Sequence, residues 1–351
     1  MTERWGMKET QTENGKTEKI HRPDGGNTTA GSGDAVSIKE KSKVPQSAAV
    51  AQADGENGRR GRLTRKSGAK NARTFKYAAW LGWASESNWT DPYLFAIYSV
   101  IRPLASMLIV VVMYFFVSKA GNFSNPDFLA FMFIGSAFYM FIFNVMIELS
   151  WVVVTDREHY QVLKYIYISP SNLYIYLLGR GFSKVAITII ASVITFIFGI
   201  YVLKIPIHVS PQNMPMLVAA LVLGFIALVS FGIALSGATL LLPRGSGYLM
   251  ESVAGIFYLF CGVLFPLSVL PGPAQTFGMF IPFTYWFEML RRTMLHSGTW
   301  VDPTMRYFSN EQILGILALT TLFFVVFSIY VFKTSERRAR MHGQFDMQTW
   351  Y

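Results

Sequence analysis

Cysteine and charge are both scarce in this sequence of 351 residues. The single cysteine, Cys261, excludes an internal disulfide framework and any zinc site built from several cysteines. Charged residues make up 15% of the chain and hydrophobic residues 52%. Because soluble domains carry roughly one quarter charged residues, this composition predicts an all-α polytopic membrane protein.

Sequence motifs for nucleotide, metal and nucleophile chemistry are missing as well. No complete G-x-x-x-x-G-K-[ST] phosphate-binding loop occurs, and neither H-E-x-x-H nor G-x-S-x-G is present. The five histidines are scattered along the sequence and form no cluster with cysteine. We therefore expect no catalytic site, no metal and no cofactor in this chain, and any energy source would have to be a separate protein.

The beginning of the chain is polar and basic. Residues 1–76 carry 16 Lys and Arg against nine Asp and Glu, which supplies +7 of the net charge of +10. Residues 1–74 offer too little apolar surface to offset the entropy of ordering, so we expect a disordered cytoplasmic tail. Its charge suits an anionic membrane surface, and we expect lipids rather than nucleic acid as its partner. Tyr77, Trp80 and Trp83 then predict an amphipathic interfacial helix over residues 75–90.

Six apolar runs follow, and each is long enough for the roughly 20 residues that cross 30 Å of hydrocarbon. The distribution of Lys and Arg among the loops predicts both termini in the cytoplasm, with a six-span domain over residues 91–334 and a tail at 335–351. Glu148, Arg180 and Lys184 lie near the cytoplasmic ends of these runs, where we expect ion pairs. The runs are Tyr93–Val117, Phe128–Val154, Leu173–Leu203, Met216–Leu242, Tyr248–Leu270 and Ile313–Phe332.

The segment Gln275–Leu295 is too interrupted for an ordinary span. Pro282 stands in its middle, and Arg291 and Arg292 stand near its end. We predict a helical re-entrant segment or a pair of short helices, shielded by the rest of the protein and placed on the external side.

The segment Thr155–Pro170 is a charged island between the second and third apolar runs. If it is a helix, Tyr160, Leu163 and Tyr167 fall on one face. Asp156 and Lys164 then fall elsewhere, where water or a partner protein can meet them. This position and pattern suit a surface helix that transmits force to the neighbouring spans.

Two segments carry a resemblance to a known family. Cys261–Leu295 contains a Gly, a Phe-Pro, a Leu-Pro, a Pro-x-Thr-Tyr and a Leu-Arg in an order that resembles type-2 exporter permeases of the ATP-binding cassette (ABC) transporters. The loop after the second run resembles the corresponding loop of that family in Glu158, Leu163 and Ser169-Pro170, although His159-Tyr160 replace the usual Gly-Thr. The signature residues are Gly262, Phe265, Pro266, Pro271, Pro282, Thr284, Tyr285, Glu288 and Arg291.

The resemblance implies a half-transporter that moves a substrate out of the cytoplasm across the cell (inner) membrane. Its partners would be a second permease copy, identical or homologous, and an ATPase subunit that binds ATP and Mg. Contact with that subunit would involve Asp156, Arg157, Glu158, His159, Tyr160, Gln161, Leu163, Lys164 and Arg244.

Several alternatives stay open at this point. The chain can also be a channel or scaffold that uses no ATP, or a secondary carrier, although a carrier would be expected to show an internal repeat and midplane charges. Aromatic residues in the runs can line a substrate route or simply face lipid. The candidates for the route are Phe133, Tyr139, Phe141, Tyr258 and Phe260.

Overall fold

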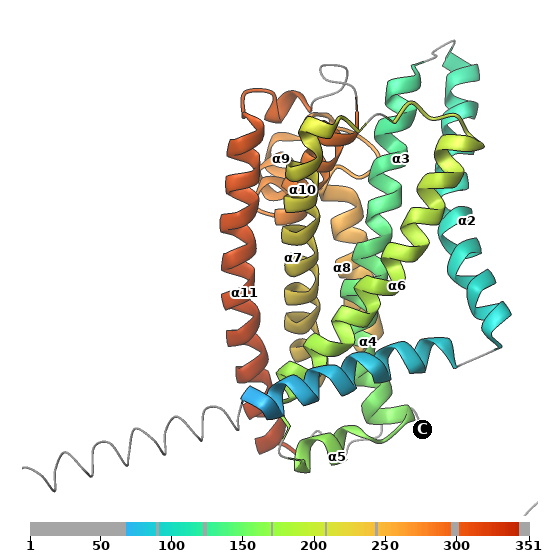
Figure 1. Cartoon of the computed structure of the whole chain (residues 1–351). Coiled ribbons are helices and arrows are strands. Elements are labelled where there is room, and N and C mark those ends of the chain that lie inside the picture. The colour runs from blue at the N-terminus through green and yellow to red at the C-terminus, as the bar shows by residue number, and fades with distance from the viewer. Residues whose placement is uncertain are drawn as a thin grey trace, which may run out of the picture. The chain divides into compact units, whose positions relative to one another are not determined.

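The computed structural model describes residues 68–88, 91–121, 125–169, 171–207, 209–242, 245–295 and 302–343. All regular structure within these ranges is helical, which confirms the predicted all-α class (Figure 1). The expected disordered tail lies outside the described residues except for residues 68–74, and so do the last residues of the chain from 344 onward.

Among the described residues, five helical segments are long and apolar enough to cross a membrane. Their residues match five of the six predicted runs to within a few positions, except that the last helix ends nine residues beyond its run. Four of these runs contain no proline, and the first helix continues through Pro103. The helices are α2 (Pro92–Gly121), α3 (Pro126–Phe141) continued by the π-helix η1 (Ile142–Ile147) and α4 (Glu148–Val154), α6 (Leu173–Tyr201), α7 (Met214–Leu241), and α11 (Asn310–Met341).

The prediction of one continuous helix over Tyr248–Leu270 is wrong. Helix α8 (Ser246–Phe260) has 15 residues, which is about 22 Å at 1.5 Å per residue. It ends because Gly262 takes a left-handed conformation with φ of 67° and Pro266, which follows, has no backbone N–H to continue a helix. In Figure 1, α8 begins at the end of the bundle that holds α5 (Leu163–Ile168), and α11 begins at the opposite end. We call these the α5 end and the α9 end.

Helix starts follow the local sequence. The Asn125 side chain caps α3 by accepting bonds from the backbone N–H groups of Asp127 and Phe128, and Pro126 occupies the first turn. Ser309 and Gln312 form a capping box at the start of α11. These caps place the helix boundaries where the apolar runs begin, and α11 continues to Met341, seven residues past the predicted domain end.

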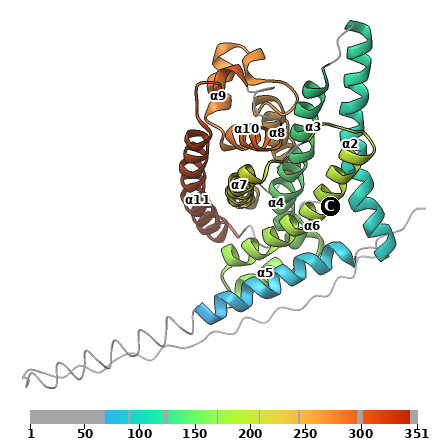
Figure 2. The same ribbon diagram turned by 45° about the horizontal axis from the view of Figure 1, so that its top comes forward.

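Helix α7 lies at the centre of the bundle, in contact with α11, α4, α6 and α10 (Pro282–Met294) (Figure 2). Small residues let its neighbours approach closely. Gly232 faces Met146 and Leu149, and the Ser150 hydroxyl donates to the Gly232 carbonyl at 3.2 Å. Gly224 leaves room for the fully buried indole of Trp286.

A helix over residues 68–87 crosses the α5 end of the bundle (blue in Figure 1). Its start lies at least seven residues before the predicted position. Ala78 and Gly82 are buried against α6, where the Ser183 hydroxyl donates to the Ala79 carbonyl. The side chains of Tyr77, Trp80 and Trp83 are exposed.

Gly224→Ala tests the close packing of α7 against α10. The new methyl group meets the buried Trp286 ring, so we expect a loss of about 1–3 kcal/mol and a lower thermal unfolding midpoint in detergent. Gly315→Ala in α11 is the control, because nothing lies within 4 Å of its added Cβ and alanine favours a helix by about 1 kcal/mol. Equal midpoints for the two variants would contradict the packing.

Candidate functional site

The segment Thr155–Pro170 is not one helix. Helix α4 continues as the π-helical turn η2 (Thr155–His159), the chain then breaks, and the short helix α5 begins at Leu163. The break contains Gln161 with φ of 54°, a left-handed conformation that no L residue adopts within a helix. The predicted single amphipathic helix is therefore replaced by two short elements at an angle.

Asp156 and Arg157 are buried, contrary to the prediction that this polar face meets water or a partner. The Tyr176 hydroxyl donates to Asp156 Oδ2 at 2.7 Å, and Arg180 Nη2 lies 3.8 Å from Asp156 Oδ1. Arg157 Nη2 donates to Glu158 Oε1 at 2.7 Å. Asp156 is turned inward because α6 supplies its partners, which a sequence pattern does not reveal, whereas Arg157 pairs with its neighbour Glu158.

The other residues of the predicted coupling surface differ in how far they are buried. Leu163 is buried in the apolar cluster at the α5 end, and Lys164 is half-buried. Within residues 155–169, the exposed side chains are His159, Tyr160, Gln161, Tyr165, Tyr167 and Ile168. Arg244 lies outside the described residues.

A second polar network joins three elements at the α5 end. Lys184 Nζ on α6 donates to Glu86 Oε1 at 2.5 Å and to Glu148 Oε2 at 2.7 Å. Arg180 Nη1 donates to the Ser85 hydroxyl at 3.0 Å. Helix 68–87, α4 and α6 are thus linked by charge-assisted bonds, which are stronger than bonds between neutral groups. The ion pairs expected for Glu148, Arg180 and Lys184 are confirmed.

At the α9 end, the predicted pair of short helices is confirmed as α9 (Gly272–Met279) and α10. Nearly every residue of α10 is buried. Arg291 Nη2 donates to the carbonyls of Gly262 and Val263, both at 2.8 Å, and its guanidinium lies 3.6 Å above the Phe131 ring. Arg291 therefore ties the turn after α8 to α3 and α10.

Glu288 and Arg291 are both buried on α10, and Asp302 is buried at the same end of the bundle. Since α10 carries both signs of charge side by side, each charge stabilises the other.

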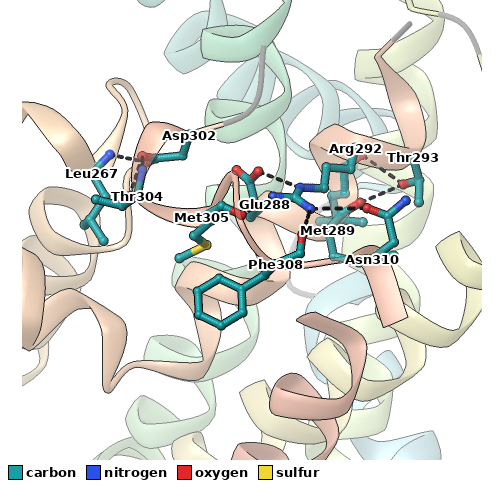
Figure 3. Close-up of polar contacts among 11 residues, drawn as sticks. Leu267, Glu288, Met289, Arg292, Thr293, Asp302, Thr304, Met305, Phe308 and Asn310 are labelled. Carbon is teal, nitrogen blue, oxygen red and sulfur yellow. Dashed lines mark hydrogen bonds and ion pairs between the residues drawn. The ribbon is translucent and has the colours of Figure 1, made fainter. Parts of the chain in front are cut away.

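Glu288 and Arg292 fix α10 to the start of α11 (Figure 3). Arg292 Nε donates to Glu288 Oε1 at 2.8 Å, and the other guanidinium nitrogens reach the Met305 and Phe308 carbonyls at 2.7 Å. Asp302 accepts from the backbone N–H groups of Leu267 and Thr304. The α9 end is therefore held together by buried charges that bond to backbone carbonyls and N–H groups.

The remaining signature residues shape the backbone around α9 and α10. The Thr284 hydroxyl donates to the Gly278 carbonyl at 2.6 Å, which joins the two helices. Pro271 immediately precedes α9, and Pro282 stands in the first turn of α10, where a missing N–H costs nothing. Pro266 and Tyr285 are buried, and Phe265 is half-buried.

A cavity of about 260 Å³ lies between α2, the α3–η1 segment and α8. The Tyr139 and Tyr258 rings meet edge to face with centroids 4.7 Å apart, and the Tyr139 hydroxyl donates to the Ala254 carbonyl at 2.9 Å. Asn144 reaches the cavity from η1, and π-helical turns frequently occur at functional sites. None of the described lining residues is charged: Ser106, Val110, Ser136, Tyr139, Met140, Phe143, Asn144 and Tyr258.

Only two of the five aromatic residues predicted for the route line this cavity. Phe133 and Phe141 are fully buried in the core, so that part of the prediction is wrong. The Phe133 ring lies over Gly199, and the ring centroids of Phe141 and Phe225 are 5.1 Å apart. The ring centroids of Phe260 and of Phe277 on α9 are 5.1 Å apart. Hydropathy does not distinguish aromatic residues of the core from those that line the cavity. The sequence feature that indicates the cavity is the set of small polar residues on apolar helices, such as Ser106, Ser136 and Asn144.

Comparison with protein families matches residues 76–295 to the family described as ABC-2 type transporter. The chain belongs to the ABC-2 type transporter family. The match begins within helix 68–87 and ends at Leu295, directly after α10, so it includes both polar ends of the bundle. Compared with curated proteins one by one, this ABC-2 protein matches none of them. With its apolar helices, the family assigns the chain to the multi-pass membrane components of ABC transport.

Arg291→Gln tests the clamp at the α9 end of this ABC-2 protein. It removes the stacked guanidinium and leaves buried carbonyls without a donor, each costing about 1–3 kcal/mol. We expect a clearly lower thermal unfolding midpoint in detergent. Arg306→Gln, at an exposed arginine of the same end, is the control and should leave the midpoint unchanged. A stable Arg291→Gln protein would refute the clamp.

Cysteine labelling tests whether the cavity is accessible. Because Cys261 is buried, background reaction with a small thiol reagent should be low. We expect Asn144→Cys to react in intact membranes, since the residue lines the cavity. Phe141→Cys, in the adjacent core, should not react. Equal labelling of both positions would show that the cavity is not a distinct space.

Proposed function

We propose that this chain is the permease subunit of an ATP-driven ABC exporter. The observation that carries the proposal is the α5 end, where an exposed surface adjoins charge networks that reach α4, α6 and helix 68–87. Proteins of this family typically work with an ATPase subunit, and we take this surface as its contact. The chain has no phosphate-binding loop of its own, so ATP and Mg would bind to that partner.

The proposed topology has six crossings with both termini in the cytoplasm. Helix α8 is too short to cross alone, but together with the turn after it and α9 it carries the chain from the α5 end to the α9 end. The α9–α10 pair would then sit in the outer half of the membrane, where Arg291 is satisfied by carbonyls rather than water. Helix 68–87 would lie in the cytoplasmic interface, with its exposed tryptophans among the lipid headgroups.

The proposed coupling path begins at the exposed residues His159, Tyr160 and Gln161 and the outer face of α5. Movement of the ATPase would shift η2, and the Asp156–Tyr176 bond would pass the shift to α6. The Glu148–Lys184 bond joins α4, which η2 continues, to α6 about two turns further in. Buried Asp156, Arg157 and Leu163 would thus transmit motion rather than contact the partner.

A second permease copy is proposed to pair along α8. Glu251, Ser252 and Gly255 are exposed on this helix. A Cβ atom added at Gly255 would have no other atom within 4 Å. Polar and small residues on a membrane helix are costly against lipid and favour close contact with another helix. The cavity lined by Tyr139, Asn144 and Tyr258 would then adjoin the shared route for a lipid, glycan or drug-like substrate moving outward.

Co-purification with an ATPase tests this function. The tagged full-length chain, extracted from its native membrane, should bring with it vanadate-sensitive ATP hydrolysis and a subunit that contains a phosphate-binding loop. Tyr160→Ala and Ile168→Asp change exposed positions at the α5 end. We expect each to lower the co-purifying activity about tenfold, the effect of removing a contact worth over 1.4 kcal/mol.

The control is Tyr307→Ala, which changes a residue that is 94% exposed at the α9 end. It should retain full activity. Absence of ATPase activity with the unaltered chain would reject an ATP-driven exporter. Full activity with both α5-end variants would reject this surface as the contact while leaving the exporter intact.

A further inference from the structure

Two cavities flank Arg180 at the α5 end. One, of about 640 Å³, lies between helix 68–87 and the segment after α4, and is lined among others by Trp80, Leu81, His159 and Val162. The other, of about 440 Å³, extends toward Glu148 and Lys184. Both are lined by Ser85, Tyr160 and Arg180. Each volume is in the range of small-molecule sites, roughly 300–1,000 Å³.

Arg180 is 5% exposed, yet most of its donors are unused by the described residues. A guanidinium has five N–H donors. Nη1 donates to Ser85, Nε has no partner, and the 3.8 Å separation from Asp156 is too long for a hydrogen bond. A buried charge with few hydrogen bonds is costly. The side chain is therefore suited to receive an anionic oxygen from a ligand in the cavities.

The charge around the two cavities does not suit a simple anion. Among the described lining residues, Glu86, Glu148 and Asp156 are acidic and Arg180 and Lys184 are basic. Lys184 is bonded to both glutamates. Acidic groups beside the basic ones favour a ligand that carries an ammonium group as well as an anionic group. Tyr160 and Trp151 add aromatic faces that attract such a cation.

Apolar side chains complete the site. Trp80 and Leu81 line the larger cavity and are also exposed on helix 68–87, next to Tyr77 and Trp83. Aromatic residues in this arrangement favour the headgroup zone of a membrane. A ligand here would meet charged groups on one side and an apolar rim on the other, as an amphiphile does.

We propose that these cavities bind the zwitterionic headgroup of a phospholipid, with its phosphate on Arg180 and its ammonium among Glu86, Glu148 and Tyr160. The lipid would join helix 68–87 to the segment after α4. This site is distinct from the cavity between α2, η1 and α8, and it does not depend on ATP-driven export.

Native mass spectrometry of the purified full-length chain tests the site. The protein is delipidated in detergent and exposed to phosphatidylethanolamine, to phosphatidylglycerol or to inorganic phosphate. We expect phosphatidylethanolamine to be retained preferentially, with Arg180→Gln lowering retention at least about tenfold, as the loss of a charge-assisted hydrogen bond predicts. Arg306→Gln, at an exposed arginine of the α9 end, should retain lipid as the unaltered chain does.

Trp80→Ala covers the case in which Arg180→Gln does not fold. This side chain is 67% exposed, so its loss should weaken lipid retention without changing the unfolding midpoint. Equal retention of both lipids, displacement of phosphatidylethanolamine by inorganic phosphate, or full retention by a folded Arg180→Gln or Trp80→Ala protein would overturn the proposal. So would the absence of any retained lipid, which would leave water as the occupant.

Discussion

Lys184 holds three elements together with one ammonium group. Its bonds to Glu86 and Glu148 connect helix 68–87, α4 and α6 at the point where the bundle meets the interface. A charge that is removed from water needs a partner within the protein. One of these partners, Glu86, lies almost 100 residues before Lys184 in the sequence. The position of helix 68–87 across the bundle therefore depends on this charge as well as on the buried Ala78 and Gly82.

The same constraint operates at the α9 end with different chemistry. There, Arg291 and Arg292 bond mainly to backbone carbonyls in the turn after α8 and in the segment before α11. A non-helical backbone is tolerated inside a membrane protein only when the protein satisfies it. The arginines thus make the interrupted segment between α8 and α11 possible, and the tight turn at Gly262 depends on them.

Together the two ends describe a bundle with polar networks at the α5 end and the α9 end and an apolar middle. The middle contains the uncharged cavity beside η1, while the α5 end contains the charged cavities beside Arg180. Export of a substrate would require motion between these regions. In the proposed coupling path, the Asp156–Tyr176 and Glu148–Lys184 bonds would pass such motion from one helix to the next.

The sequence by itself determined the helical class, five of the six long apolar segments, and the short helices around Pro282, because hydropathy and proline act locally. It also indicated the family through Gly262, Pro266 and Arg291. Only the tertiary structure decided that Asp156 points inward and that Phe133 and Phe141 are core. Those outcomes depend on partners such as Tyr176 and Gly199, which are distant in sequence and leave no periodic pattern.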